Sequence, residues 1–528
     1  MASITKSIRS IAVIGAGPAG IACVNELVHV AKNGLSTLEL NEKPSLGNSA
    51  FDKIVCFEQN DNIGGVWNFF EKPDPNLPPL NYLQNNQFNN PDKIYEFPKL
   101  PKNSILSNST YNSPYISYSN KTFEDEIRWN KNAAYKDLFT NIPEKFMKFS
   151  YTPYENISKG RFLEPLISSN DVKNYLDKII NNYNLFKYFR TSSSVEFIEK
   201  DEINNIWKLT IRQKSRFSKI EQWYTENFDA IILANGHCNV PFIPKIDNLL
   251  EFVKKFPNVL RHSKSFRNVN DFKNGNILLC GSGTSSADLT QYLSPISKSI
   301  TISQRSETVY PWIKECFAKS ENLSFKPRIK KFLIDEKYIE PTVEFDDGSI
   351  KSFDHIILST GYHYHFPFLP KSKNYIKIYN ENYNSSSPIN KIGNLYLYTF
   401  STIDNSLATV GIPTIGLMFH AMEYSAAAIA GVFSGIKKLP SINEQIKWDN
   451  KRTKIDKPEV PHRFQGFFTD KLEEQLLNPL FELAPLNRTV PLIKDNIKAT
   501  DVDQSNPALI KAYMALISGK VNSKDLIK

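Results

Sequence analysis

Two glycine-rich turns in the sequence have the spacing that binds nucleotide phosphates. In the first, IAVIGAGPAG, an apolar run leads into Gly15, Gly17 and Gly20, spaced as GxGxxG. The first glycine permits a tight turn, the second lets the backbone approach a pyrophosphate, and the third lets the next helix pack on the strand. The N-terminus of that helix points its N–H groups at the phosphates. The motif predicts a dinucleotide site; an ordinary glycine turn is the alternative.

The second turn, NILLCGSGTSSADL, has Gly281 and Gly283 but Ser286 in place of the third glycine. Serine is small enough to keep the helix close to the strand. The strand that follows, SITISQRS, ends near Arg305 and without a carboxylate. An arginine can bind a 2′-phosphate that an acid would repel, so the sequence favours NADPH over NADH. An ordinary surface arginine is the alternative.

A carboxylate and a glycine pair follow the first turn. The strand IVCFEQN places Glu58 at its carboxyl edge, where it could accept the ribose hydroxyls of an adenine nucleotide. Its distance from Gly20 is longer than usual, which we attribute to a polar insertion; an exposed strand-end glutamate is the alternative. Next, NIGGVWNF contains Gly64, Gly65 and Trp67. Such a segment could wrap around a flat ring system, or form a tight turn covered by a core tryptophan.

These motifs need buried parallel strands to position them. Helical periodicity follows the first and the fourth of the apolar runs, which gives strand, glycine turn and helix twice. We also expect the irregular segment 71–132, rich in Pro, Asn, Ser and Tyr, to be ordered partly by lying over the core. The strand-like runs are Ile11 to Ile14, Ile54 to Phe57, Ile231 to Ala234, Asn276 to Cys280, Ile300 to Ser303 and Ile356 to Ser359.

Composition narrows the function classes. A chain of 528 residues is long enough for two or three compact units. Its net charge is +9, but 64 Lys and Arg are interleaved with 55 Asp and Glu, which argues against nucleic acid as a partner. The five scattered cysteines include no CxxC pair, which argues against a flavin disulfide reductase. We expect no signal peptide and no transmembrane segment, so any membrane contact would be peripheral.

The order GxGxxG, distal Glu and GGxW resembles the FAD half of the flavin-containing monooxygenase family. The stretch YKDLFTNIPEKFM is similar to a family segment whose asparagine lies beside the reactive face of the isoalloxazine ring. The resemblance assigns that catalytic role to Asn141, whose amide could bridge a flavin oxygen adduct and the nicotinamide. The alternative is an asparagine that closes a turn before Pro143.

The stretch FPNVLRHSKSF is similar to the family fingerprint FxGxxxHxxxF/Y. Phe266 favours this family over Baeyer-Villiger enzymes, which typically have Trp there. Asn258 replaces the fingerprint glycine, and asparagine also tolerates a positive φ. We interpret His262 as ordering the hinge between domains by hydrogen bonding rather than as a base.

Two later segments extend the resemblance. The sequence STGYHYHF resembles the family segment in which the chain returns to the FAD domain, and ILANGH resembles its outward counterpart, with Asn235 replacing Thr. His363 and His365 alternate, but they lack nearby carboxylate or cysteine ligands, so we predict no metal site. The segment SLATVGIPTIGLMFHAMEYSAAA resembles the region whose helix N-terminus faces the flavin pyrimidine ring.

The predicted fold class is α/β, with two three-layer Rossmann-like dinucleotide-binding domains and the NADPH domain inserted into the FAD domain. The predicted boundaries are 1–243 for the first part of the FAD domain, 244–352 for the NADPH domain, and 353–528 for the rest of the FAD domain with a C-terminal helical segment. The implied cofactor-binding residues are Gly15, Gly17, Pro18, Ala19, Gly20, Glu58, Gly65, Val66, Trp67, Thr140, Asn141, Val195, Gly281, Gly283, Thr284, Ser285, Ser286, Asp288 and Arg305.

The resemblance implies that NADPH reduces FAD, that reduced flavin forms a hydroperoxide with O₂ at carbon 4a, and that this oxygenates a soft nucleophile. Fungal relatives suggest small thiols, with amines as a second class. The alternatives are a Baeyer-Villiger or N-hydroxylating enzyme, and a flavoprotein that binds or senses nucleotides without oxygenation. We expect a cytoplasmic protein. A peripheral location at the endoplasmic reticulum and a homodimer stay open.

Overall fold

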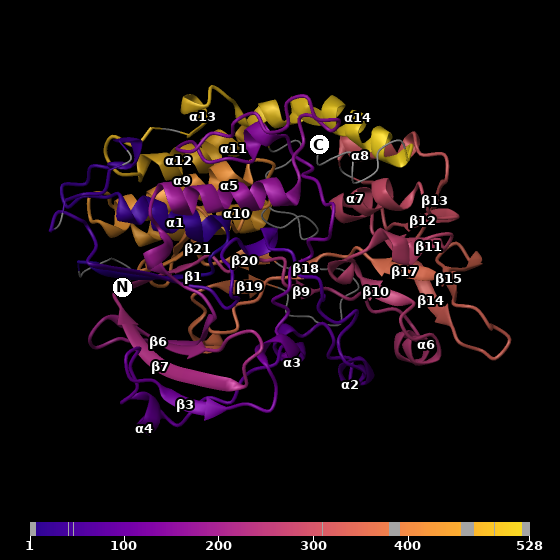
Figure 1. Ribbon diagram of the computed structural model, residues 1–528, viewed down its shortest axis with the longest axis horizontal. Helices are drawn as coiled ribbons and strands as arrows, with labels where there is room; N and C mark the ends of the chain where they lie inside the picture. Colours follow the sequence, from indigo (N-terminus) through magenta and orange to yellow (C-terminus); the bar gives the residue numbers. More distant parts are fainter. Residues whose placement is uncertain are drawn as a thin grey trace.

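The protein, whose structure is a computed structural model, is built on two β-sheets (Figure 1): one is entirely parallel, and the other is parallel except at the edge formed by β21 and β22. The structure describes residues 7–40, 42–45, 47–308, 310–379, 391–455, 469–489 and 491–519. The N-terminal and C-terminal ends, on which the expectations about targeting partly depend, lie outside these ranges. The first sheet has, in spatial order, β21 (Leu395–Tyr396), β22 (Phe400–Ser401), β23 (Leu407–Thr409), β8 (Ala230–Leu233), β1 (Ser10–Ile14), β2 (Lys53–Phe57) and β4 (Phe189–Arg190).

Strand β1 is an interior strand of the first sheet and runs parallel to both of its neighbours, β2 and β8. Ile11 pairs with Ile54 of β2 and with Ala230 of β8, so the carboxyl ends of the three strands meet at one edge. Side chains alternate between the two faces. Ile11 and Val13 pack against helices, whereas Ala12 faces an antiparallel sheet on the other side. This gives the three layers that the fold class predicts.

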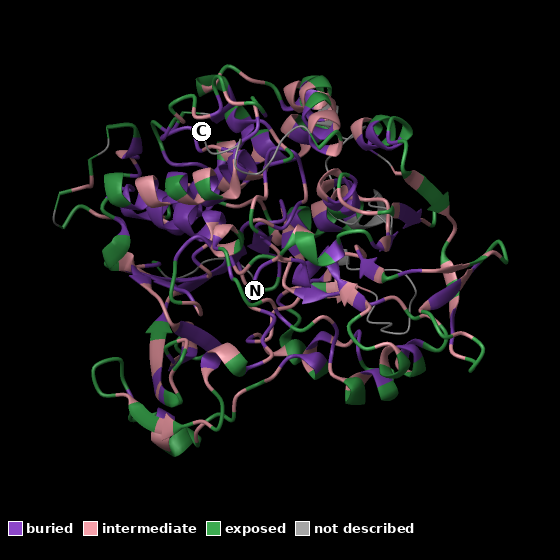
Figure 2. Ribbon diagram, turned by 45° about the vertical axis from the view of Figure 1, so that its right-hand side comes forward, coloured by how far each residue is buried: buried purple, intermediate pink, exposed green. Residues whose placement is uncertain are grey.

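Helices cover one face of the first sheet and an antiparallel sheet covers the other (Figure 1). Figure 2 shows that the strands between these layers are mostly buried. The helices are α1 (Pro18–Val28), α5 (Ser169–Asn182), α9 (Met418–Phe433) and α10 (Ile442–Ile455). The antiparallel sheet contains β3 (Tyr115–Tyr118), β7 (Ile220–Phe228), β6 (Ile206–Gln213) and β5 (Ser193–Asp201).

The second sheet is entirely parallel. Leu279 of its central strand packs on the helix that follows, whereas Leu278 packs on α6 (Leu249–Lys255) and a small antiparallel sheet. The strands, in spatial order, are β10 (Leu260–His262), β17 (His355–Leu358), β11 (Asn276–Cys280), β12 (Ser299–Ser303) and β13 (Leu323–Lys326). The helices are α7 (Thr284–Leu293) and α8 (Pro311–Ala318), and the small sheet has β14 (Ile329–Leu333), β15 (Thr342–Phe345) and β16 (Ile350–Ser352).

The two crossings between the sheets pair with each other. After β8 the chain forms β9 (Val240–Pro241), and after β17 it forms β18 (Tyr362–His363), which is antiparallel to β9. Since β17 belongs to the second sheet, the chain has not left that sheet at residue 352. The three domain ranges remain predictions. We propose that the boundary predicted between residues 352 and 353 lies after Leu358 instead. A separate pair contains β19 (Lys377–Tyr379) and β20 (Lys391–Gly393).

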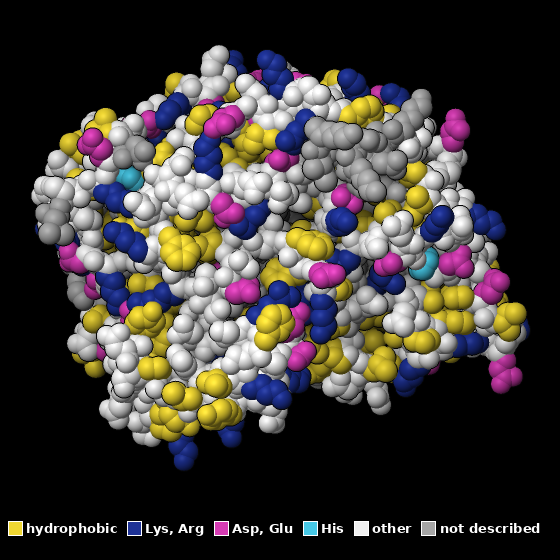
Figure 3. All heavy atoms as spheres, viewed as in Figure 1, with side chains coloured by type: hydrophobic (Ala, Val, Ile, Leu, Met, Phe, Trp, Pro, Cys, Tyr) yellow, Lys and Arg dark blue, Asp and Glu magenta, His cyan; other side chains and the backbone are white. Residues whose placement is uncertain are grey.

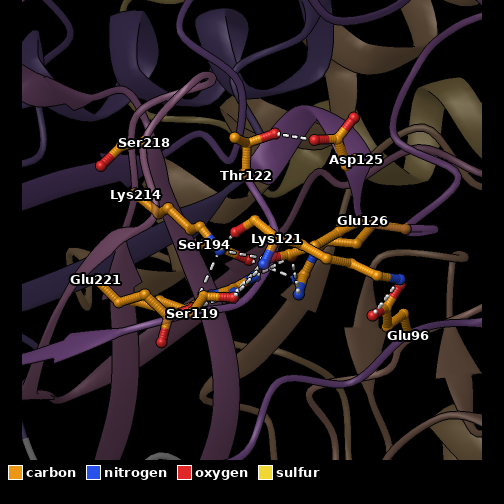
Figure 4. A network of polar contacts seen from close by, with 12 residues as sticks. Glu96, Ser119, Lys121, Thr122, Asp125, Glu126, Ser194, Lys214, Ser218 and Glu221 are labelled. Atoms are coloured by element: carbon orange, nitrogen blue, oxygen red, sulfur yellow. Dashed lines mark hydrogen bonds and ion pairs between the residues drawn. The ribbon is translucent and has the colours of Figure 1, made fainter.

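The segment 71–132 lies against the antiparallel sheet and the crossings. It contains α2 (Leu80–Gln84), α3 (Pro91–Ile94), α4 (Asn103–Leu106) and β3. Figure 4 shows its polar anchor: the Lys214 ammonium lies 2.6 Å from a carboxylate oxygen of Glu126 and 3.2 Å from one of Glu221. At the crossings, Ile243 donates its backbone N–H to Asn89 over 2.9 Å. The segment is thus ordered, as the expectation of cover over the core required.

The C-terminal segment connects the helical layers of the two sheets. Helix α12 packs on α9, and α14 packs on α7 and α8. Its elements are α11 (Thr469–Leu472), a π-helical turn at Glu473–Leu477, α12 (Asn478–Glu482), α13 (Pro491–Lys494), a 3₁₀ helix at Ala499–Ser505 and α14 (Asn506–Ile517). Within the described ranges, no helix has both the length and the apolar character needed to cross a bilayer. Figure 3 shows cationic and anionic side chains interspersed over one face of the molecule.

Candidate active site

The first glycine turn lies at the carboxyl end of β1 and can only be built from glycine. Gly15 has φ +102°, and a Cβ there would lie 2.5 Å from the carbonyl oxygen of Ala234. A Cβ on Gly20 would lie 2.0 Å from the carbonyl oxygen of Gly15. Helix α1 then starts at Pro18 without a side-chain cap and without an acid in its first turn. Its N–H groups are therefore available to a phosphate, as the motif predicts.

Glu58 and the glycine pair complete one cradle with this turn. The carboxylate of Glu58 is buried and accepts N–H bonds of 2.9 Å from Ala16 and from Asn60. Burial raises its pKa above the ordinary range of a glutamate. Gly65 packs so closely on Gly17 that a Cβ would lie 2.7 Å from the Gly17 Cα. A second bond joins the loops, because Gly64 donates its N–H to Ala16 over 2.9 Å.

The other residues predicted for the first cradle differ in their burial and position. Val66 is exposed, and Trp67 is partly buried against the helical face of the core. Val195 has its side chain in the core between β1, β2 and the antiparallel sheet. Its strand is joined to the cradle, because Ser193 donates its N–H to the Glu58 carbonyl over 2.8 Å. Three motifs separated in sequence are thus held together by glycine contacts and backbone hydrogen bonds, and their backbone N–H groups and carboxylate fit an adenine dinucleotide such as FAD.

The second glycine turn repeats the first in the other sheet. Gly281 has φ +119°, and a Cβ there would lie 2.5 Å from the carbonyl oxygen of Ser359. Ser286 takes the place of the third glycine, and its hydroxyl donates a 2.6 Å bond to the Gly281 carbonyl. The serine therefore strengthens the turn instead of opening it. Helix α7 follows Gly283 without a side-chain cap, and of its first residues Thr284 is half-buried and Ser285 is exposed.

Arg305 lies beside this second turn. It is exposed, two residues after β12. Gly281 donates its N–H to the Ser303 carbonyl over 2.8 Å, and the Ser282 hydroxyl donates to the Ser306 carbonyl over 3.2 Å. These contacts bring the backbone on both sides of Arg305 to the glycine turn. The position suits a guanidinium that binds a 2′-phosphate.

Asn141 is exposed in a loop that is held from both sides. Thr140 is buried and exchanges two bonds with Ile167, of 2.9 Å from its N–H and 3.2 Å to its hydroxyl. On the other side, the loop is bonded to α7. The phenol of Tyr135 donates to the Asp288 carboxylate, and Phe139 donates its N–H to the Tyr292 hydroxyl over 3.2 Å. Asp288 thus contacts the loop of Asn141.

A pocket of about 60 Å³ opens beside Asn141. Its walls come from the Asn141 loop, the start of α8 and the start of α9, and its roof comes from the C-terminal segment. The start of α9 is the region that the family resemblance places at the flavin. The lining residues are Asn141, Ile142, Pro143, Tyr310, Pro311, Trp312, Gly416, Leu417, Leu472, Ala499, Val502, Asp503, Ser505, Asn506 and Leu509.

The crossings have the roles that the fingerprint suggests. His262 is buried, accepts the Lys264 N–H at Nδ1 over 3.1 Å, and lies 3.1 Å from the Gly361 carbonyl through Nε2. Burial lowers its pKa to about 3, so the ring is neutral and joins the two crossings by hydrogen bonds. Asn258 has φ +68°, as the replacement of a glycine required.

The two alternating histidines face different partners. His363 lies 3.2 Å from the Asn89 amide oxygen, and His365 lies 3.1 Å from a carboxylate oxygen of Asp92. Both partners belong to the segment 71–132. In the part of the chain that the structure describes, no group of three or more His, Cys, Asp or Glu is arranged to hold a metal ion.

Several site residues were not predicted. Tyr292 holds the Asn141 loop, yet in sequence it looks like any aromatic residue of an amphipathic helix. Asp503 lines the pocket from beyond the region of family resemblance, which ends near Trp448. Lys264 forms a buried ion pair of 3.1 Å with Asp74 at the crossings. Tyr292 and Lys264 pair with residues distant in sequence, and Asp503 reaches the pocket through the packing of the C-terminal segment, so no local pattern could have indicated them.

The sequence profile described as flavin-binding monooxygenase-like matches residues 119–335 and 319–484, which is more than half of the chain. The chain belongs to this family. Flavin-containing monooxygenase FMO GS-OX-like 9 of Arabidopsis thaliana is 27% identical over 442 residues, which cover 83% of this chain and 78% of that protein. Trimethylamine monooxygenase of Methylocella silvestris is 24% identical over 488 residues, covering 92% and 88%.

Solved structures have the same fold. S-allyl-L-cysteine S-oxygenase from Allium sativum has a TM-score of 0.64 and 20% identity, and covers 94% of this chain and 93% of its own. Tmm from Pelagibacter sp. has a TM-score of 0.63 and 20% identity, covering 90% and 86%. The predicted fold class and family are therefore confirmed. The chain is a flavin-containing monooxygenase, an oxidoreductase that uses FAD and NADPH.

Proposed function

We propose that this monooxygenase uses NADPH and O₂ to oxygenate small soft nucleophiles, with thiols as its main substrates and amines as a second class. The observation that carries the proposal is the position of Asn141. Its loop is bonded to α7, the helix that starts at the second glycine turn, and its pocket reaches the start of α9. Both nucleotide sites can therefore meet at one small pocket.

We assign the first cradle to FAD and the second turn to NADPH. The backbone from Gly15 to Gly20 and the carboxylate of Glu58 would hold the pyrophosphate and the ribose of FAD. The second turn at Gly281–Ser286 and the guanidinium of Arg305 would hold NADPH. When bound, FAD supplies acceptance of the hydride and activation of oxygen, which no protein side chain can provide.

The protein's own residues position the reactants and exclude water. The amide of Asn141 can donate one hydrogen bond and accept another, so it can orient oxygen-bearing groups at the flavin and the nicotinamide amide together. The C-terminal segment closes the pocket from above. Exclusion of water limits the loss of oxygen as hydrogen peroxide before a substrate is oxygenated. No side-chain nucleophile is needed for this reaction.

The preference for thiols rests on resemblance to fungal relatives. One protein of similar fold is named S-allyl-L-cysteine S-oxygenase, which indicates oxygenation of sulfur, and one relative is named trimethylamine monooxygenase, which indicates oxygenation of an amine. Thiol sulfur and amine nitrogen are both nucleophiles, and sulfur is the softer of the two. Phe266, which stands where Baeyer-Villiger enzymes typically have Trp, favours this chemistry over ketone oxygenation.

Stoichiometry tests the proposal. For a thiol, NADPH, a proton, O₂ and RSH should give NADP⁺, water and RSOH in equal amounts. Purified FAD-loaded enzyme is given NADPH with small thiols, tertiary amines or cyclic ketones, while NADPH oxidation, O₂ uptake, product and hydrogen peroxide are measured. We expect coupled turnover with thiols. Coupled turnover with ketones alone, or peroxide equal to NADPH with every substrate, would refute the proposal.

A further inference from the structure

We propose that the pocket beside Asn141 selects substrates that carry a positive charge close to the reacting sulfur or nitrogen, and that Asp503 binds this charge. The inference rests on the proposed function and narrows its substrate class to small cationic thiols and amines. It concerns a residue of the C-terminal segment that lies beyond residue 484, where the match to the family profile ends.

The roof of the pocket has a defined position above Asn141. Gly416 at the start of α9 packs so closely beneath it that a Cβ would lie 2.7 Å from Cγ1 of Val502. The backbone N–H of Ala499 donates a 2.6 Å bond to a carboxylate oxygen of Glu473. Leu509 of the adjoining helix packs in one cluster with Phe139 of the Asn141 loop. The roof, the start of α9 and the Asn141 loop therefore form one packed unit.

Two carboxylates on the roof have different roles. Asp501 is used by the fold, because it accepts the Lys498 N–H over 2.8 Å and a bond of 3.2 Å from the Gln504 amide. Asp503 lines the pocket. Among the described residues, no ion pair forms with its carboxylate. The residue is exposed as a whole, but partial burial of its carboxyl raises the pKa, and no neighbouring charge contributes to that shift.

The other lining residues fit a cation and not an anion. Among them there is no lysine, arginine or histidine, and Asp503 is the one carboxylate. Tyr310 and Trp312 add aromatic rings to the wall at the start of α8, and ring faces attract ammonium groups. A carboxylate in a pocket that also presents aromatic rings stabilises an ammonium and repels a second carboxylate. An ammonium at Asp503 would leave the other end of a short molecule free to reach toward Asn141.

Three small thiols that differ mainly in charge test the inference. They are 2-aminoethanethiol, which is cationic, 2-mercaptoethanol, which is neutral, and mercaptoacetate, which is anionic. The measured quantity is kcat/KM for coupled oxygenation, expressed as the ratio of the cationic to the neutral thiol. We expect Asp503→Asn to lower this ratio by about two- to fivefold, the range of one partly exposed ion pair. Asp503→Lys should lower it further and raise kcat/KM for mercaptoacetate.

Comparing ratios between variants removes the intrinsic reactivity of each thiol. Glu336→Gln, which removes one exposed carboxylate from the loop after β14, controls for net charge and should leave the ratio unchanged. An unchanged ratio in both Asp503 variants, with coupled turnover of all three thiols, would overturn the inference while the proposed function stands. Absence of coupled turnover with every thiol and amine would instead mean that the proposed function fails.

Discussion

Tyr135 donates a hydrogen bond to Asp288, and this contact joins the loop of Asn141 to the helix that follows the second glycine turn. The acceptor, Asp288, has a pKa far above the usual range of an aspartate. Burial raises the pKa of Asp288 to about 7, although the bonds from Tyr135 and Gln291 lower it. The contact between the two nucleotide sites therefore changes its protonation state near neutral pH.

Asp288 should make stability depend on pH. Its pKa is near 3.9 in an unfolded chain and about 7 in the folded protein. The folded state therefore binds more protons between these values, and stability falls as the pH rises through that window. Raising the pH from 5 to 8 should therefore lower the free energy of unfolding by about 3 kcal/mol through this one group. Asp288→Asn should remove this pH dependence. In nucleotide-free protein, the Tm of the variant should therefore fall less between pH 5 and pH 8 than the Tm of the unsubstituted protein. Equal falls would contradict the assigned titration.

Asn141→Ala should separate NADPH oxidation from oxygen transfer. The amide is placed where it can stabilise an oxygen-bearing group, and loss of one such donor typically costs about a hundredfold in rate. We expect thiol oxygenation to fall by about that factor, while NADPH is still consumed and most oxygen leaves as hydrogen peroxide. Peroxide and product are measured per NADPH. Asn204→Ala, in an exposed turn, is the matched control and should remain coupled.

The two glycine turns should fail independently. Gly15→Ala places a Cβ against the Ala234 carbonyl and should lower the FAD content of the purified protein. Gly281→Ala meets the Ser359 carbonyl in the same way, and should raise KM for NADPH while FAD stays bound. Gly348 also has a positive φ, +77°, but its Cβ would meet nothing within 4 Å. Gly348→Ala therefore tests strain without a clash, and loss of either cofactor there would contradict the assignment.

The strands and turns could be predicted because their signals are local. Apolar runs, glycine spacing and the tolerance of Asn258 for a positive φ depend only on neighbouring residues, and all of them hold in the structure. The contacts that join the two glycine turns could not be predicted from the sequence. Tyr135 and Asp288 are separated by 153 positions. Strand β17 joins the second sheet through partners on β11 and β10 that lie 78 and 96 positions earlier (355 − 277 and 356 − 260). Such pairings follow from the packing of whole layers.

The roof of the pocket illustrates the same limit. Asp501 and Asp503 are two residues apart in one polar stretch, and the sequence gives them the same character. The structure uses Asp501 to cap the 3₁₀ helix and leaves Asp503 to line the pocket. Which acid faces the substrate depends on the position of this segment above α9.

Arg305→Ala should change the choice of nucleotide. If the guanidinium binds the 2′-phosphate, its loss removes a charge-assisted bond, and kcat/KM for NADPH should fall by about ten- to a hundredfold. NADH lacks that phosphate, so its kcat/KM should change little. Both are obtained from initial rates with one thiol. Lys319→Ala, at the surface end of α8, serves as the control for lost positive charge. Equal losses for both nucleotides would place the phosphate elsewhere.

Arg212 should be the most important charge for the antiparallel sheet that carries the segment 71–132. It is buried on β6 and lies 2.7 Å from Glu126, 2.9 Å from Glu196 and 3.0 Å from Glu221. Burial raises the pKa of Glu126, but bonds from Arg212 and Lys214 outweigh it and lower the pKa overall. The stabilisation is therefore complete above the unfolded pKa of about 4.3 and is lost as the pH falls through the lower folded value.

Arg212→Met removes the cation and leaves buried carboxylates without it, which typically costs about 3–5 kcal/mol. Fluorescence of the buried Trp207 and Trp223, which lie in the same sheet, reports its unfolding in urea at pH 7. Arg216→Met is the matched control: its partner Glu124 lies 2.6 Å away, but its side chain is partly exposed, so a cost of about 1 kcal/mol or less is expected. In the Arg212 variant the added stability on going from pH 3 to pH 7 should also shrink. An equal loss in both variants would mean that burial of the network does not determine its energy.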